Sequence, residues 1–139
     1  MDEAFFISED KLKLDIDFIH SYLSEESYWA KGRSVEAVKR SIENSSCLGV
    51  YTKNWKQIGF ARLVTDQVVF AWIMDVFIDK DYRGKGISKK LMHHILQMPE
   101  ITDVNGIGLR TIDAHGLYKK FGFERIRDAE TWMLKKIRE

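Results

Sequence analysis

The stretch that decides the fold is Ile78-Asp79-Lys80-Asp81-Tyr82-Arg83-Gly84-Lys85-Gly86-Ile87-Ser88. It follows an apolar strand pattern and opens a helix whose apolar side chains repeat at helical spacing. Two glycines let the backbone curl closely around an anion, because glycine has no Cβ. The helix N-terminus adds unpaired N–H groups and the positive end of the helix dipole. We predict an anion site here, most simply for a pyrophosphate; a plain tight turn is the alternative.

The patterns on either side of this turn predict a mixed α/β domain, with antiparallel N-terminal strands and a central parallel β-α-β crossover. That crossover should be right-handed. Ligands tend to bind where such strands diverge. The expected strands are two short pieces between Glu3 and Leu14, then Cys47 to Thr52, Gln57 to Thr65, Phe70 to Ile78, Val104 to Thr111 and Trp132 to Lys135. The expected helices are Ile16 to Leu23, Val35 to Asn44, Ile87 to Met98, and Ala114 to Phe121 behind an Asp113 cap.

Length and composition narrow the class of protein. The 139 residues fit a single domain, 1–139, and 22 basic against 21 acidic side chains leave a net charge of +1. A nucleic-acid partner is therefore not expected. Cys47 is the only cysteine, which argues against a disulfide framework or a cysteine zinc site, and no metal is expected. The longest apolar run, Val68 to Met74, falls short of the about 20 residues of a membrane span. With no secretory pattern in residues 1–20, we expect a cytoplasmic domain.

Two motifs together resemble one enzyme superfamily. Arg83-Gly84-Lys85-Gly86-Ile87-Ser88 is similar to the acyl-CoA signature [Q/R]-x-x-G-x-[G/A] of the GNAT N-acetyltransferases, with Ser88 at the last position. Downstream, Ala114 to Phe123 resembles the family pattern A-x-x-L-Y-x-x-x-G-F, and Thr111 stands where the family often has Asn. The motifs occur in the family's order and spacing, and the flanking elements extend the resemblance over nearly the whole chain.

The resemblance implies the GNAT fold, with acetyl-CoA lying in a V-shaped cleft between strands 70–78 and 104–111. The family's activity is transfer of the acetyl group to an amine. Here that implies direct transfer to a small-molecule amine in a ternary complex; a catalytically silent CoA-binding regulatory or interaction module is the alternative. Relatives are commonly dimers, so a homodimer is possible. The residues implied in cofactor binding are Val76, Phe77 and Ile78 on the strand, Arg83, Gly84, Lys85, Gly86, Ile87 and Ser88 on the turn, and Tyr118.

Two side chains are candidates for catalysis. Tyr118 matches the family tyrosine that protonates the departing thiolate, a role suited to a phenol pKa of about 10; core packing is the alternative. Asp75 interrupts an apolar strand, on the face expected for Ile73 and Phe77. A charge there must be paired or face the cleft. Asp75 is thus a candidate base for the incoming ammonium, or else the partner of a basic residue such as Arg62 or Arg110.

The acceptor side is expected in the irregular segment after the first helix. Tyr28, Trp29 and Arg33 lie there, and in the GNAT superfamily the corresponding region lines the acceptor pocket. Two aromatic rings and a guanidinium suit a flat or anionic acceptor. The alternative for Trp29 is that it covers the sheet edge.

Overall fold

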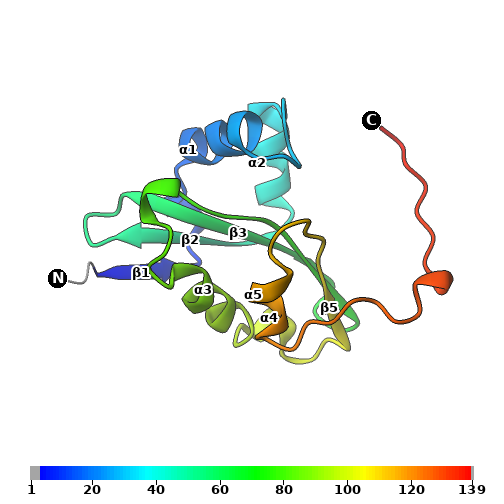
Figure 1. Cartoon of the computed structure of the whole chain (residues 1–139). Helices are drawn as coiled ribbons and strands as arrows, with labels where there is room; N and C mark the ends of the chain where they lie inside the picture. Colours follow the sequence, from blue (N-terminus) through cyan, green and yellow to red (C-terminus); the bar gives the residue numbers. More distant parts are fainter. Residues whose placement is uncertain (1–3, 139) are drawn as a thin grey trace.

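A computed structural model describes residues 4–138, and one five-stranded mixed sheet forms its centre (Figure 1). The strands lie in chain order, with β1 to β4 antiparallel and β5 parallel to β4. Their bounds are β1 (Phe5–Ser8), β2 (Ser46–Thr52), β3 (Gln57–Thr65), β4 (Phe70–Ile78) and β5 (Gly106–Gly108). The mixed α/β class and the parallel crossover expected after β4 are both confirmed.

Helices cover both faces of the sheet (Figure 1). The α-helices are α1 (Ile16–Ser21), α2 (Val35–Glu43), α3 (Ile87–Ile95), α4 (Pro99–Thr102) and α5 (His115–Lys119). Short turns of other helix types are η1 (Lys11–Lys13), η2 (Tyr22–Glu26), η3 (Lys80–Tyr82) and η4 (Ala129–Thr131). Helices α1 and α2 lie on one face, and α3, α4 and α5 on the other. None of the helices in residues 4–138 is long and apolar enough to cross a membrane.

The sheet separates two apolar cores. One lies under α3 and contains Leu48, Leu63, Ile73 and Leu91, while the other lies under α1 and α2 and contains Phe60 and Phe77. Alternate residues of a strand point to opposite faces, so β2 and β3 supply both cores. This double burial explains why β3 and β4 read as almost continuous apolar runs in the sequence.

β4 carries a bulge at Asp75. Phe60 pairs with Phe77 but Arg62 pairs with Met74, so β4 has one residue more than β3 in this interval. Asp75 takes the left-handed conformation, with φ of 54°. One extra residue reverses the alternation of side chains. The expectation that Ile73, Asp75 and Phe77 share a face is therefore wrong, because Ile73 packs under α3 and Phe77 packs under α1 and α2.

The C-terminal segment also differs from the sequence expectation. Residues 132–138 form no strand in the described part of the chain, and they run away from the sheet (Figure 1). β5 is shorter than expected, and the first helix continues into the π turn η2. A strand exists only where a neighbour supplies hydrogen bonds, which a local sequence pattern does not reveal.

Candidate active site

A cavity of about 500 Å³ opens where β4 and β5 separate. The two strands are paired from Phe70 to Trp72 and diverge beyond that point. The cavity is lined by residues 72–76 of β4, residues 109–114 after β5, Tyr28, Trp29 and Arg33 of the loop between η2 and α2, and Tyr118 of α5. The cleft expected between these strands is confirmed, and it gathers residues from four separate parts of the chain.

The glycine turn leads from β4 into α3 with an open backbone. Gly84 and Gly86 have φ values of +79° and +77°, a region that side chains other than glycine rarely adopt. A Cβ placed on either glycine would have no atom within 4 Å. Gly86 directly precedes α3 and lacks a capping side chain, so N–H groups of the first turn remain available to an external acceptor. The turn thus has the space and the donors that an anion requires.

Arg83 anchors this turn. Its Nε donates to the carbonyl oxygen of Ile78 at 3.2 Å, and its Nη2 donates to the hydroxyl of Tyr22 at 2.6 Å. Arg83 therefore connects the turn to β4 and to η2. The resemblance implies Arg83 in cofactor binding, and its observed hydrogen bonds hold the backbone of the turn in place. Lys85 lies over the ring of Tyr82, at 5.8 Å from its centroid.

The free side of β4 forms the floor of the cleft. β5 pairs only with the first three residues of β4, Phe70 to Trp72. Val76 to Ile78 therefore have no strand neighbour on that side among residues 4–138. Their backbone groups can pair with an extended ligand arm. The side chain of Phe77 points to the opposite face, where it stacks on Tyr22 at 3.9 Å between ring centroids. Ile87 is buried in the core and Ser88 is half-buried.

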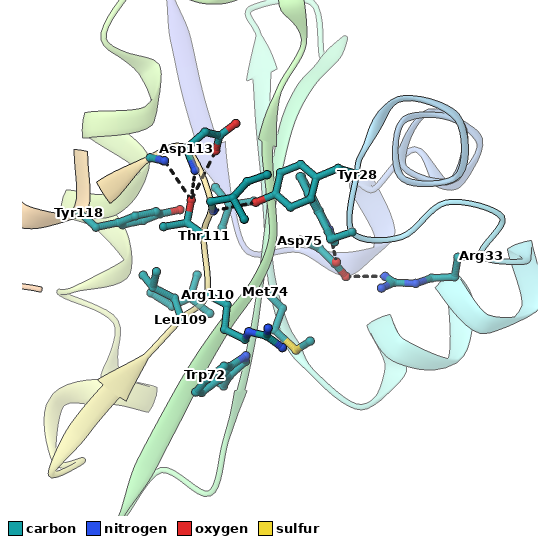
Figure 2. A pocket seen from close by; sticks show the side chains of 15 residues that line it. Tyr28, Arg33, Trp72, Met74, Asp75, Leu109, Arg110, Thr111, Asp113 and Tyr118 are labelled. Carbon is teal, nitrogen blue, oxygen red and sulfur yellow. Dashed lines mark hydrogen bonds and ion pairs between the residues drawn. The ribbon is translucent and has the colours of Figure 1, made fainter. Parts of the chain in front are cut away.

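Tyr118 enters the cavity from α5. Its side chain is 9% exposed, its ring packs edge-on against Phe123, and its hydroxyl is directed into the cavity (Figure 2). Burial, reinforced by Tyr28 and Asp113, raises the pKa of Tyr118 above its ordinary value. The phenol therefore remains protonated at neutral pH and can act as a proton donor.

Thr111 holds the start of α5. Its Oγ1 accepts from the backbone N–H of Ala114 at 3.0 Å and from that of Asp113 at 3.4 Å. The expectation that Asp113 caps this helix is therefore wrong, because the threonine hydroxyl reaches these groups. Thr111 therefore stabilises the start of α5 through its hydroxyl, at the position where the family pattern often has Asn.

Asp75 lies at the centre of a buried network. Its carboxylate accepts from Arg33 Nη1 at 2.8 Å, Arg62 Nε at 2.9 Å and Trp29 Nε1 at 2.9 Å, and its side chain is 1% exposed. Burial raises the pKa of Asp75, but the guanidinium groups of Arg62 and Arg33 outweigh it and lower the pKa below its ordinary value. The ion pair with Arg62, which the sequence left open, is therefore present. A carboxylate with a lowered pKa and three donors is a weak base.

The loop between η2 and α2 lines the cavity with Tyr28, Trp29 and Arg33. Tyr28 accepts a hydrogen bond from the backbone N–H of Ile112 at 3.2 Å and packs edge-on against Trp29. Figure 2 shows Tyr118 and Asp75 on opposite sides of the cavity, with Asp75 directed toward Arg33. The three residues expected on the acceptor side all line the cavity, and Trp29 and Arg33 are also engaged by Asp75.

A model of the acetyltransferase (GNAT) domain matches residues 44–125, which is more than half of the chain. The chain belongs to the GNAT acetyltransferase family. The matched region runs from β2 through α5 and includes both sequence motifs. The resemblance seen in the sequence is therefore confirmed.

Curated relatives of this GNAT domain include the uncharacterized N-acetyltransferase ycf52 of Gracilaria tenuistipitata var. liui. That relative is 36% identical over 100 residues, covering 68% of this chain and 54% of the relative. The peptidyl-lysine N-acetyltransferase YjaB of Salmonella typhimurium is 32% identical over 111 residues, covering 78% of this chain and 69% of the relative. This chain spans little more than half the length of several curated relatives that it matches.

Solved structures confirm the fold of the GNAT domain. A protein of Xanthomonas campestris pv. campestris assigned to the GNAT family is 35% identical, with a TM-score of 0.93, and covers 96% of this chain and 94% of that one. Glucosamine-6-phosphate N-acetyltransferase from Arabidopsis thaliana shares the fold at 17% identity and a TM-score of 0.68, covering 98% of this chain and 100% of that one.

Sequence reasoning missed part of this GNAT site. Ile112 lines the cavity, and Arg33 joins Arg62 on Asp75, whereas Arg110, the other partner considered for Asp75, lines the cavity. The partners Arg33 and Asp75 are 42 residues apart, so no local spacing indicated the pair. A carboxylate in an otherwise apolar strand is the signal that pointed to a buried ion pair.

Proposed function

We propose that this GNAT domain transfers the acetyl group of acetyl-CoA directly to the amine of a small-molecule acceptor, in a ternary complex. The observation that carries the proposal is the continuity of the site. The open glycine turn continues into the unpaired side of β4, and the cavity beside that strand holds the Tyr118 hydroxyl. A pyrophosphate, an extended arm and a thioester would meet these features in order.

Acetyl-CoA supplies the activated acyl group. The backbone N–H near Val76 would stabilise the negative charge that develops on the thioester oxygen, because a fixed donor acts most strongly in a partly closed cavity. As the acceptor nitrogen forms its bond to the carbonyl carbon, the carbon–sulfur bond breaks and Tyr118 gives its proton to sulfur. Solvent then takes the proton that the acetylated nitrogen loses and returns a proton to the phenol. The raised pKa of Tyr118 keeps this proton in place before the reaction.

Direct transfer is favoured over a covalent acyl-enzyme route. Cys47, the only cysteine, is 3% exposed and packs in the core under α1 and α2. Burial raises its pKa to about 11, so the thiol is protonated at neutral pH. A buried, protonated thiol is a poor nucleophile. This favours direct attack of the amine on the thioester.

Asp75 is assigned to positioning in this proposal. Its three hydrogen bonds hold Trp29 and Arg33 at the cavity wall. The acceptor ammonium then loses its proton to solvent, and the rate should rise with the fraction of neutral amine. The alternative is that Asp75 is the base, and the variant Asp75→Asn tests it.

The test is an acceptor panel with acetyl-CoA, followed by release of free thiol. The panel combines small amines with a lysine peptide, because one relative is named for peptidyl-lysine. The small amines should support turnover with the wild type, and Tyr118→Phe should reduce it. Tyr51→Phe is a matched control, since the Tyr51 hydroxyl is buried without a partner and lies outside the cavity. Binding of CoA without turnover on any acceptor would favour the silent module; turnover on the peptide alone would overturn the small-molecule assignment.

A further inference from the structure

One cation on the wall of the active-site cavity has no partner. Arg110 follows β5, lines the cavity and is exposed to it. Its guanidinium forms no hydrogen bond and no ion pair with any group in residues 4–138. The other guanidinium of the wall, that of Arg33, is held by Asp75 at 2.8 Å. A guanidinium carries five N–H donors in a flat fork, so the donors of Arg110 are available to a ligand.

The side chain of Arg110 belongs to the acceptor side of the cleft. Its neighbour Leu109 packs against the core under α3, and Tyr118 is buried in that same core. Figure 2 shows Leu109 and Arg110 directed to opposite sides of the chain that follows β5. Arg110 therefore projects toward the face of α1 and α2. The loop that carries Trp29 and Arg33 lines the cavity from this face.

Trp72 gives the same face of the cavity a flat apolar wall. Its ring lies over Gly108, where an added Cβ would come within 2.6 Å of Trp72 Cζ3. Gly108 pairs with Trp72 across the two strands, and Arg110 follows two residues later. The missing side chain at Gly108 thus makes room for the ring at the point where the strands separate. A ligand bound at Arg110 would meet an aromatic surface as well as a charge.

The remaining charges leave this side of the cavity positive. Arg33 and Arg62 share the single carboxylate of Asp75, so these two cations and one anion together carry a net charge of +1. Asp113, the other acid of the lining, lies toward α5 and away from Arg110 (Figure 2). A partly enclosed site with charge of one sign concentrates ligands of the opposite sign. The acceptor side is therefore suited to an anionic group.

We propose that the acceptor amine also carries an oxyanion, a carboxylate or a phosphate, and that Arg110 binds this group. The inference rests on the proposed function, because it names the class of amine that the site acetylates. The fork of Arg110 matches two oxygens of such a group, and the Trp72 ring packs against the carbon skeleton that joins the oxyanion to the amine. The pyrophosphate of the cofactor is proposed at the turn after β4, whereas Trp72 lies near the start of that strand. The two anion sites are therefore separate.

Paired acceptors test the proposal in turnover with acetyl-CoA. Each pair differs by one oxyanion: phenylalanine against phenethylamine, and phosphoethanolamine against ethanolamine. For one of the pairs, the ratio of kcat/KM for the anionic member to kcat/KM for the neutral member should fall about tenfold or more in Arg110→Gln, because a charge-assisted hydrogen bond is lost. The ratio is compared between proteins, so the different basicity of the amines cancels. Arg40→Gln is the matched control, because Arg40 is an exposed arginine of α2 outside the cavity, and it should keep the wild-type ratio. Turnover with equal ratios in all three proteins would overturn the proposal.

A binding measurement separates this proposal from the proposed function. Absence of thiol release with every acceptor would contradict acetyl transfer, and calorimetric titration of the chain without cofactor then decides the role of Arg110. Phenylpropionate and phenyl phosphate carry the oxyanion without an amine, and phenylpropanol is the neutral probe.

The wild type should bind one of the two anions more tightly than the neutral probe, and the anion preferred identifies a carboxylate or a phosphate. Arg110→Gln should bind that anion about tenfold or more weakly. Arg110→Lys keeps the charge without the fork, so its affinity should fall between the two. Failure of both anions to bind, or equal affinities of the wild type and Arg110→Gln, would contradict the assignment of Arg110.

Discussion

Asp75 combines two costly features in one residue. A residue other than glycine in the left-handed backbone region loses about 1–2 kcal/mol of stability. A buried charge also lowers stability unless it is paired. Here φ is 54° and the carboxylate is almost wholly buried. The donors on Trp29, Arg33 and Arg62 offset both costs, because they hold the carboxylate where the bulge directs it.

Asp75→Asn should therefore destabilise the fold. The substitution leaves Arg62, whose side chain is 9% exposed, without its counter-charge, and breaking a buried pair costs about 3–5 kcal/mol. Urea unfolding measures the change. Glu9→Gln removes an exposed partner of His94 and should alter stability by less than about 1 kcal/mol. Unchanged stability together with a large loss of kcat/KM at low pH would instead identify Asp75 as the base.

The same network predicts the acid limb of stability. The pKa of Asp75 is lower in the folded chain than in the unfolded one, so its contribution is fully present above the unfolded value of about 3.9. That contribution is lost as the pH falls through the folded value. The free energy of unfolding of the wild type should fall over this acid window more steeply than that of Asp75→Asn. Parallel curves for the two proteins would show that Asp75 does not titrate as stated.

Tyr118→Phe tests the proposed acid without removing the ring. General acid catalysis contributes about 10²–10⁴-fold, so kcat should fall by about that factor. The apparent affinity for acetyl-CoA should change little, because the hydroxyl acts mainly in the transition state. A pH–rate profile with the best acceptor makes the comparison, and any high-pH limb due to the phenol should be absent from the variant. Equal kcat values across the profile would remove Tyr118 from the mechanism.

At the scale of elements, the turn between β4 and α3 does two things at once. It redirects the chain from the sheet to the face that α3 covers, and it leaves backbone N–H groups open at the start of the helix. Arg83 keeps this geometry through its contacts with Ile78 and Tyr22. The backbone, more than any charged side chain, defines the proposed anion site.

Gly86→Ala should weaken binding of CoA by about tenfold or more, because a Cβ at this turn would occupy the space that the phosphates approach. Gly32→Ala is a matched control. Gly32 has φ of +76° against +77° for Gly86, and neither added Cβ meets an atom within 4 Å. Both variants should thus carry a similar backbone strain of about 1–2 kcal/mol. Calorimetric titration with CoA compares them, and equal affinities would place the pyrophosphate elsewhere.

At the scale of the whole molecule, the sheet ends in a free edge at β5 while an apolar tail leaves the same chain. The two cores under the sheet are complete without residues 132–138. The tail therefore contributes no side chain to either core.

A homodimer, which the family resemblance implies, would make thermal stability depend on protein concentration. Association of folded chains stabilises them by mass action, so the Tm of the wild type should rise as the protein is concentrated. Scanning calorimetry at a series of concentrations measures the change. A Tm that does not vary with concentration would argue against a homodimer.

Features that depend on neighbouring residues could be predicted from the order of amino acids. The bounds of β3 and β4 agree with their apolar runs, and the glycine turn and the start of α3 lie where the motif predicts them. Tyr118 lines the predicted cleft because the helix motif and the crossover both constrain its position. Periodicity, turn chemistry and motif spacing act over a few residues, so they can be read along the chain.

Features that join distant residues became visible in the folded chain alone. The bulge at Asp75 arises from the register between two strands, and its partners Trp29 and Arg33 come from a loop more than 40 residues away. The cap of α5 is local, but the conformation of residues 111–114 decides that the Thr111 hydroxyl, and not Asp113, reaches the N–H of Ala114. The pattern from Trp132 to Lys135 forms no strand without a neighbour, since ladder hydrogen bonds belong to two segments and not to one.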